Sequence, residues 1–173
     1  MLSDATPLAG YPEPYATLCA VLQDGTREWR GELDPEISDE AVAWQPHPSA
    51  PSIAHLMLHI IGVELAWFEG TVQKKEWNRE EVELVMLQEI DVDQDKWPPL
   101  PLRPFSWYLD LHDHFRARIL EGIKSWPSAD AAIEDGEESV TPRWVLGHVI
   151  QHEAYHGGQI VLLNRLWHLL NRA

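Results

Sequence analysis

The sequence contains a single cysteine, few basic residues and no long hydrophobic run. Cys19 has no second cysteine to pair with, so the fold forms without a disulfide, as is usual in a reducing cytosol. Lys and Arg number 13 against 28 Asp and Glu, and the net charge of −15 disfavours binding to phosphate backbones and anionic lipid headgroups. No stretch approaches the roughly 18 apolar residues of a membrane-spanning helix, and residues 1–15 lack the basic and apolar regions of a secretory signal. We therefore expect a cytoplasmic protein that binds neither nucleic acid nor a membrane.

The hydrophobic pattern predicts an all-α fold in one domain. The chain has 173 residues, of which 45% are hydrophobic, so we expect residues 1–173 to form a single domain. Apolar residues recur at helical spacing in four long segments, and no segment shows the strict alternation of a half-buried strand. The expected helices run from Tyr15 to about Leu33, from about Ser52 to Gly70, from after Pro104 to Trp126, and from Pro142 to about Asn171. Four helices of this length predict a four-helix bundle.

A long acidic connection separates the second and third predicted helices. It runs from Thr71 to Arg103 and is too long for a tight hairpin. We therefore expect a crossover that contains a short helix from about Arg79 to Ile90. Its many carboxylates are predicted to form a solvated helix face and loop rather than an acidic binding site.

The histidines give the clearest functional signal. His148, His152 and His156 are spaced four residues apart in LGHVIQHEAYHGGQ, and this spacing places them on one side of a helix. With a turn of about 100° per residue, His152 and His156 fall in the middle of the apolar stripe, and His148 falls to its side. Two buried imidazoles cost about 1–3 kcal/mol each unless their nitrogens are bonded. A metal ion would bond both, so the pattern predicts a metal site.

The second predicted helix supplies the third ligand. His59 lies between two apolar stripes of this helix, on a face with small residues such as Gly62 that leave room for a ligand. His55 points further from the inner stripe, so His59 is the preferred candidate. The second apolar stripe is expected to pack against a partner subunit. The predicted metal ligands are therefore His59, His152 and His156.

Three neutral imidazoles leave at least one coordination position open, as in catalytic metal sites. Nitrogen ligands favour zinc or nickel, with copper, iron or manganese as alternatives, over magnesium or calcium. The candidates to accept the second ring N–H of a ligand are Glu64, Glu153 and Gln159.

Several other residues are candidates for roles beside the metal. Tyr155 and Glu153 neighbour the ligands and are candidate acids or bases, although Tyr155 is expected to pack. Among the nine tryptophans, three are candidates to line a pocket by the metal: Trp67, Trp107 and Trp144. The remaining histidines are predicted to lie on the surface: His47, His112, His114 and His168.

At these motifs the chain resembles the DinB superfamily, also called the DinB/YfiT-like metalloenzymes. The resemblance rests on the Trp-x-Pro loop before the second helix, in AVAWQPHPSAPSIAHLMLHIIGVE, and on the His-x-x-x-His-x-Gly-Gln helix, in LGHVIQHEAYHGGQIVLLNRL. It implies an up-down-down-up bundle, often dimeric, with a divalent ion held by His59, His152 and His156. Similar proteins include bacillithiol and mycothiol S-transferases and a mycothiol-dependent maleylpyruvate isomerase. The chain departs from the family at Gly157, where an Arg that would help to hold an anionic thiol is usual.

These observations predict a metal-dependent enzyme, either a thiol S-transferase or a hydrolase, acting on a small-molecule substrate. The expected cofactors are a divalent metal ion and a low-molecular-weight thiol, and the expected assembly is a homodimer. One alternative is a non-enzymatic helical stress-response module stabilised by its ion. Another is a di-iron carboxylate bundle, which is disfavoured because Glu153-Ala-Tyr-His156 is the only Glu-x-x-His motif where two are needed.

Overall fold

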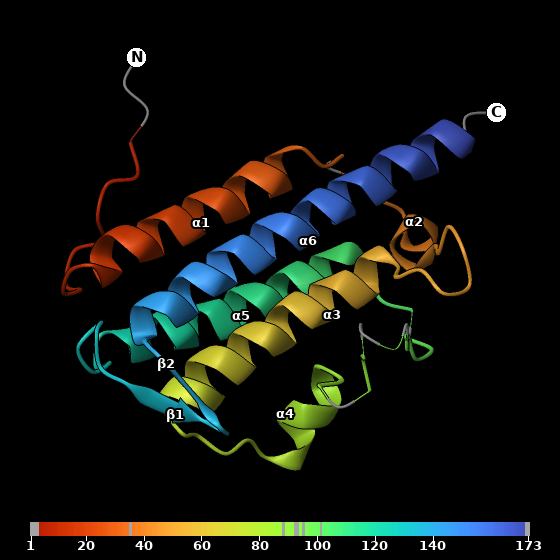
Figure 1. Cartoon of the computed structure of the whole chain (residues 1–173). Helices are drawn as coiled ribbons and strands as arrows, with labels where there is room; N and C mark the ends of the chain where they lie inside the picture. The colour runs from red at the N-terminus through yellow and green to blue at the C-terminus, as the bar shows by residue number, and fades with distance from the viewer. Residues whose placement is uncertain are drawn as a thin grey trace.

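Four long helical segments lie side by side in the computed structural model, which describes residues 4–171 except 35, 88, 92, 93, 95 and 101 (Figure 1). The long segments are α1 (Tyr15–Gly31), α3 (Ile53–Glu64) with its π-helical continuation η1 (Leu65–Val72), α5 (Phe105–Ile123) and α6 (Pro142–Leu170). The shorter elements are α2 (Asp39–Ala43), α4 (Arg79–Leu84) and the antiparallel hairpin of β1 (Ile133–Asp135) and β2 (Glu138–Val140). The prediction of an all-α fold is confirmed.

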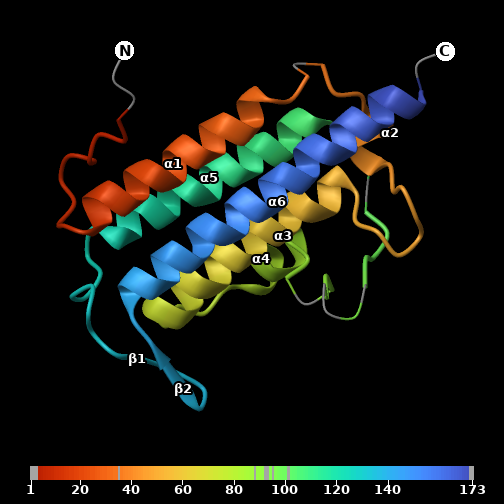
Figure 2. The same ribbon diagram turned by 45° about the horizontal axis from the view of Figure 1, so that its top comes forward.

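The long helices form two pairs of opposite direction. Figures 1 and 2 show α1 and α6 running one way along the molecule, and α3 and α5 running the other way. Because α3 and α5 are parallel, the chain has to return along the length of the helices between them. The connection from Val72 to Phe105, which carries α4, makes this return.

The helices that carry the candidate ligands begin at well-formed caps. At the start of α6, the Thr141 hydroxyl accepts a hydrogen bond from the Trp144 N–H at 3.2 Å, and Pro142 occupies the first helical position. At the start of α3, Ser52 and His55 form a reciprocal capping box. These local signals fix where each helix starts, and therefore which turns carry the histidines.

Two elements differ from the sequence prediction. The helix expected from Arg79 to Ile90 ends at Leu84, because Met86 adopts a φ of 51°, in the left-handed region that an α-helix cannot continue through. The β1–β2 hairpin was not predicted. Its strands have three residues each, too few to show an alternating pattern, and its turn depends on Gly136 with a φ of 64°.

Helix α3 is buried on nearly all sides within the chain. Five of its apolar side chains are fully buried, as is Leu65 at the start of η1: Ile53, Leu56, Met57, Ile60 and Ile61. The expectation that one stripe of this helix faces a partner subunit is therefore wrong, because both stripes are covered within one chain. By length and composition alone, the segment Ile53–Val72 could cross a membrane. However, 72% of its apolar stretch is buried inside the protein, as in a core helix of a soluble protein.

Candidate metal centre

Three histidines from two helices meet beside each other. His59 comes from α3, and His152 and His156 come from consecutive turns of α6. One potential ligand atom from each lies within 4.8 Å of the others. The Nε2 atoms of His59 and His152 are 3.0 Å apart. The structure thus brings the three predicted ligands together, and we call them the histidine triad.

The triad fits a divalent ion by geometry and by donor chemistry. Two nitrogens bound to one tetrahedral zinc at about 2.0–2.1 Å are about 3.3 Å apart, close to the separation of the two Nε2 atoms. The Nδ1–H of His156 donates to Oε1 of Gln159 at 2.7 Å, which leaves the lone pair of Nε2 free. In the described part of the chain, Nδ1 of His152 is buried without a hydrogen-bond partner. Of the three predicted acceptors, Gln159 alone fills that role.

The triad histidines are neutral at physiological pH. Burial and, to a smaller extent, the neighbouring His156 lower the pKa of His59 to about 4. Burial and the neighbouring His156 and His59 lower the pKa of His152 to about 3. Burial also lowers the pKa of His156, against the opposing effect of its hydrogen bond to Gln159. Neutral rings keep the lone pairs that a metal ion needs.

The two other predicted acceptors bind a buried arginine instead. Glu64 accepts hydrogen bonds from Nε of Arg116 at 3.0 Å and from its Nη2, and Glu153 accepts one from Nη2 at 2.8 Å. The second oxygen of Glu153 accepts from the Thr26 hydroxyl at 2.6 Å and from the Trp29 indole N–H at 3.0 Å. We call this group the Arg116 cluster: Thr26, Trp29, Glu64, His112, Arg116 and Glu153.

Two carboxylates and one guanidinium give the Arg116 cluster a buried net charge of −1 when His112 is neutral. Burial alone would raise the pKa of Glu64, but Arg116 and His112 outweigh it and lower that pKa to about 2. The negative charge of Glu64 partly opposes the lowering of the His152 pKa, so the cluster and the triad are within electrostatic range. Glu64, His112 and Glu153 lie close enough to ligate an ion themselves, but Arg116 already binds both carboxylates. We therefore interpret this cluster as an ion-pair network whose charge favours a cation in the triad.

His112 corrects a prediction, because it is fully buried rather than on the surface. Nη2 of Arg30, which can only donate, lies 2.6 Å from Nδ1 of His112. The other ring nitrogen, Nε2, lies 3.3 Å from Oε1 of Glu64 and 3.0 Å from Nη2 of Arg116. The sequence around His112 gave no signal for this, because Arg30 and Glu64 reach the ring from α1 and α3.

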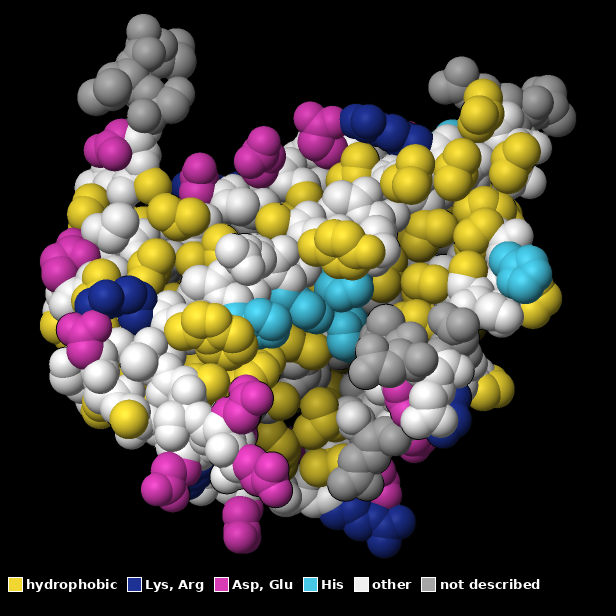
Figure 3. Space-filling model, viewed as in Figure 1, with side chains coloured by type: hydrophobic (Ala, Val, Ile, Leu, Met, Phe, Trp, Pro, Cys, Tyr) yellow, Lys and Arg dark blue, Asp and Glu magenta, His cyan; other side chains and the backbone are white. Residues whose placement is uncertain are grey.

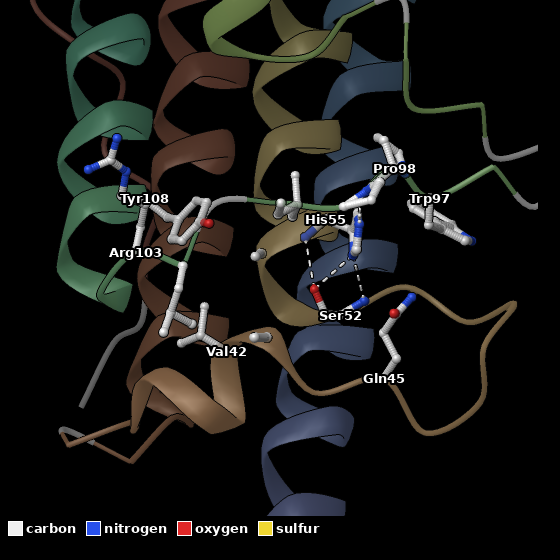
Figure 4. Close-up of a pocket in the computed structure, with 13 residues that line it drawn as sticks. Val42, Gln45, Ser52, His55, Trp97, Pro98, Arg103 and Tyr108 are labelled. Carbon is white, nitrogen blue, oxygen red and sulfur yellow. Dashed lines mark hydrogen bonds between the residues drawn. The ribbon is translucent and has the colours of Figure 1, made fainter.

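His55 has a structural role, which agrees with the preference for His59. Its Nδ1 accepts from the Ser52 N–H at 3.1 Å and lies 2.8 Å from the Ser52 hydroxyl, and its Nε2–H donates to the Pro98 carbonyl at 2.8 Å. Figure 4 shows Ser52, His55, Trp97 and Pro98 together on one side of a pocket of about 230 Å³. Both ring nitrogens are occupied, so His55 fastens the long connection to the start of α3.

Two of the three predicted tryptophans pack on His148, which is next to His152 of the triad. The His148 ring stacks on Trp144, with centroids 4.9 Å apart and planes 7° apart, and its centroid is 6.3 Å from that of His152. Trp67 stands edge-on to His148 and Trp144, at 5.2 and 5.3 Å. Trp107 lies elsewhere, against Tyr108.

The triad opens onto the molecular surface. Figure 3 shows histidine side chains in a row, flanked by hydrophobic side chains, at the edge of a hollow. Tyr155 was expected to pack, but it is 66% exposed and contacts His156 only edge-on, at 5.0 Å between ring centroids. Glu153 is unsuited to act as an acid or base, because it is buried and both of its oxygens accept hydrogen bonds.

Gly157 packs directly against Trp29, so any residue with a Cβ atom at this position would force one of the two to move. A Cβ atom at this position would lie 2.6 Å from Cγ and 2.7 Å from Cδ1 of Trp29. The Arg that is usual here in the DinB superfamily therefore has no room, and the space is filled by the indole that donates to Glu153.

The sequence of this chain matches a family of known proteins. A family model described as mycothiol S-transferase matches residues 17–166, which include the triad and most of the four long helices. A search of curated proteins found no match.

Proposed function

We propose that this chain, which belongs to the mycothiol S-transferase family, is a metal-dependent thiol S-transferase. One observation carries the proposal: three neutral histidines from α3 and α6 place their nitrogens within 4.8 Å of one another. The buried negative charge of the Arg116 cluster and the exposure of the triad to solvent support it. A site that only stabilised the fold would not need to be open to a small molecule.

In this proposal His59, His152 and His156 hold a divalent ion, zinc or nickel first and iron or manganese as alternatives. When bound, such an ion lowers the pKa of a thiol that approaches it, so that thiolate is available near neutral pH. Gln159 holds the His156 ring in the required tautomer. The thiol sulfur forms a bond to an electrophilic carbon of the second substrate, the bond to the leaving group breaks, and the thiol proton passes to solvent.

The thiol in this proposal is a low-molecular-weight thiol such as mycothiol. Because Trp29 fills the space next to Gly157, an anionic group of the thiol is not held from this position. The exposed rings of Trp144 and Tyr155 lie on the same helix as the two ligands, Trp144 about two turns before His152 and Tyr155 next to His156, where they can contact such a molecule.

We further propose that the four long helices form an up-down-down-up bundle and that the protein acts in the cytoplasm. The opposite directions of the α1–α6 and α3–α5 pairs support the bundle topology (Figure 2). The single cysteine, which cannot form a disulfide within the chain, supports the cytoplasmic location. The homodimer implied by the DinB resemblance is also a proposal, supported by the exposed Leu162 and Leu169 on α6.

The test begins with elemental analysis of protein purified without a histidine tag. We expect about one divalent ion per chain, as a three-histidine site requires. His59→Ala and His156→Ala should lose the ion, and His114→Ala, which changes an exposed histidine of α5, should keep it. Wild-type protein that stays metal-free after dialysis against zinc and nickel would contradict the proposal.

A second measurement separates an enzyme from a structural ion site. Cobalt replaces the ion, and a panel of thiols is added while the visible absorption of cobalt is recorded. We expect at least one thiol to change the spectrum and to be consumed when an alkyl halide is present. A spectrum that no thiol alters would show that the coordination is closed and that the ion is structural.

A further inference from the structure

A small apolar pocket lies against the histidine triad on the side of the long connection. One wall is formed by α3 and η1, including His59, Gly62 and Ala66, and the other by Val85, Met86 and Leu87. Its volume is about 130 Å³. Of the described residues that line this Met86 pocket, His59 alone has a polar side chain.

The local sequence explains why the pocket exists. Gly62 and Ala66 follow His59 by three and seven residues, so all three lie on one face of the helix. Because neither Gly62 nor Ala66 has a large side chain, this face is hollow. Leu87 approaches this face so closely that a Cβ at position 62 would lie 3.0 Å from its Cδ1. Met86 holds the opposite wall in place with a left-handed φ of 51°, a conformation that costs free energy in a residue other than glycine.

The pocket and the triad share the His59 ring. Nε2 of His59 is 3.0 Å from Nε2 of His152, and the same ring forms part of the pocket wall. On the molecular surface, Figure 3 shows hydrophobic side chains in a hollow beside a row of histidines. A molecule in the Met86 pocket therefore contacts a proposed metal ligand.

The size and charge of the pocket define its occupant. A cavity of about 150 Å³ lined by aliphatic side chains binds benzene, so about 130 Å³ suits a single aromatic ring or a short alkyl chain. None of the described lining residues is cationic, and the chain carries a net charge of −15, so an anionic group would find no partner here. The pocket thus selects a neutral apolar group.

We propose that the Met86 pocket binds the apolar group of the electrophilic substrate, a neutral molecule with about one aromatic ring and a leaving group on an adjacent carbon. This inference rests on the proposed thiol transfer and specifies its second substrate. With a benzyl halide, the thiol sulfur bonds to the benzylic carbon, the carbon–halogen bond breaks, halide leaves, and the thiol proton goes to solvent.

Binding can be tested without metal, thiol or turnover, because the chain has only three methionines. Protein labelled with ¹³C at the methionine methyl groups is titrated with toluene, whose ring current shifts a methyl resonance in contact with it. We expect saturable movement of the Met86 signal, while the Met57 signal, from a side chain buried in the core, stays in place. A Met86 signal that does not move would overturn the inference.

A matched pair of variants checks that toluene occupies this pocket. Ala66→Leu fills the pocket and should abolish the Met86 shift, and Ala117→Leu makes the same change on an exposed position of α5 and should preserve it. An unchanged Met57 signal shows that each variant is folded. If Ala66→Leu moves Met57, Val63→Phe from the same wall replaces it. A Met86 shift that persists in a folded variant with a filled pocket would contradict the assignment.

The substrate class is tested with zinc-loaded protein and mycothiol. Ala66→Leu should lower kcat/KM for benzyl chloride about tenfold or more and change that for chloroacetamide, which lacks a ring, less than about twofold. Equal losses for both halides would refute the role in substrate selection. If no transfer occurs while toluene binding is intact, the proposed function fails and the pocket stands. If transfer occurs and toluene does not bind, the pocket assignment fails and the proposed function stands.

Discussion

Replacing Gly157 by Ala should destabilise the protein, whereas the same change at the adjacent Gly158 should stabilise it. Both glycines lie in α6, directly after the proposed ligand His156. A Cβ at position 157 would lie 2.6 and 2.7 Å from two ring atoms of Trp29, but a Cβ at position 158 would meet nothing within 4 Å. Trp29 cannot easily move away, because its Nε1 donates to the buried Glu153.

The magnitudes follow from two opposing terms. Ala is more favourable than Gly in a helix interior by about 0.8–1 kcal/mol, and this gain applies at both positions. An added methyl in a tightly packed site costs about 1–3 kcal/mol, and this cost applies at position 157 alone. Gly158→Ala should therefore stabilise by about 1 kcal/mol, and Gly157→Ala should be less stable than Gly158→Ala by about 1–3 kcal/mol. The comparison between neighbours cancels the helix propensity and isolates the contact with Trp29.

Urea denaturation of the zinc-loaded proteins, followed by far-ultraviolet circular dichroism, measures both changes. The same pair is then made in a Trp29→Ala background, where the ring is gone and the two glycine variants should differ by less than about 0.5 kcal/mol. The destabilisation from Trp29→Ala itself is common to both and cancels. Equal stability of Gly157→Ala and Gly158→Ala with Trp29 present, or a difference that survives its removal, would refute the packing argument.

Three further predictions follow from buried ionisable groups. Glu153→Gln weakens one hydrogen-bonded ion pair of Arg116, which keeps its pair with Glu64, and should lower the free energy of unfolding by about 1–3 kcal/mol in urea, with weaker zinc binding in a chelator competition; unchanged values would show that Glu153 does not support the Arg116 cluster. In metal-free protein the folded-state pKa values of His59 (about 4) and His152 (about 3) lie below the ordinary value, so the unfolded state takes up protons first as the pH falls. The free energy of unfolding should then decline below about pH 6.5, by about 1.4 kcal/mol per pH unit for each histidine, until the pH reaches the folded-state pKa values. A urea midpoint that stays constant from pH 7 to 5 would contradict this. Burial raises the pKa of Cys19 to about 12, so iodoacetamide at pH 8 should label it in urea and not in the native state; rapid native labelling would show that the thiol is accessible.

The position of the triad could be predicted because each of its members leaves a local signal. His152 and His156 interrupt an apolar stripe at a spacing of four, and His59 lies on a helical face of small residues. The environment of His112 could not be predicted, because its partners Arg30 and Glu64 reach it from other helices and no periodicity within α5 encodes them.

Two further features could not be predicted from local sequence patterns. The end of α4 depends on a left-handed backbone at Met86, a residue type that gives no indication of that conformation. The role of Gly157 depends on Trp29, which lies at the other end of the sequence and packs against it only in the folded chain. The interaction that controls Gly157 is therefore tertiary, whereas local backbone bonds, such as that from the Leu87 N–H to the Val82 carbonyl at 3.2 Å, close the end of α4.

The Arg116 cluster also fixes the direction in which the metal ligands point. Glu153 follows His152 directly, and its two oxygens are held by groups from α1 and α5, while Arg116 of α5 binds Glu64 of α3. All four long helices are thus joined at one buried point, and neither α3 nor α6 can rotate about its axis without breaking a buried ion pair. A rigid support of this kind determines ligand geometry as well as stability. Glu153→Gln should therefore weaken zinc binding more than Gly157→Ala does, because it removes both the buried charge and the support of α6.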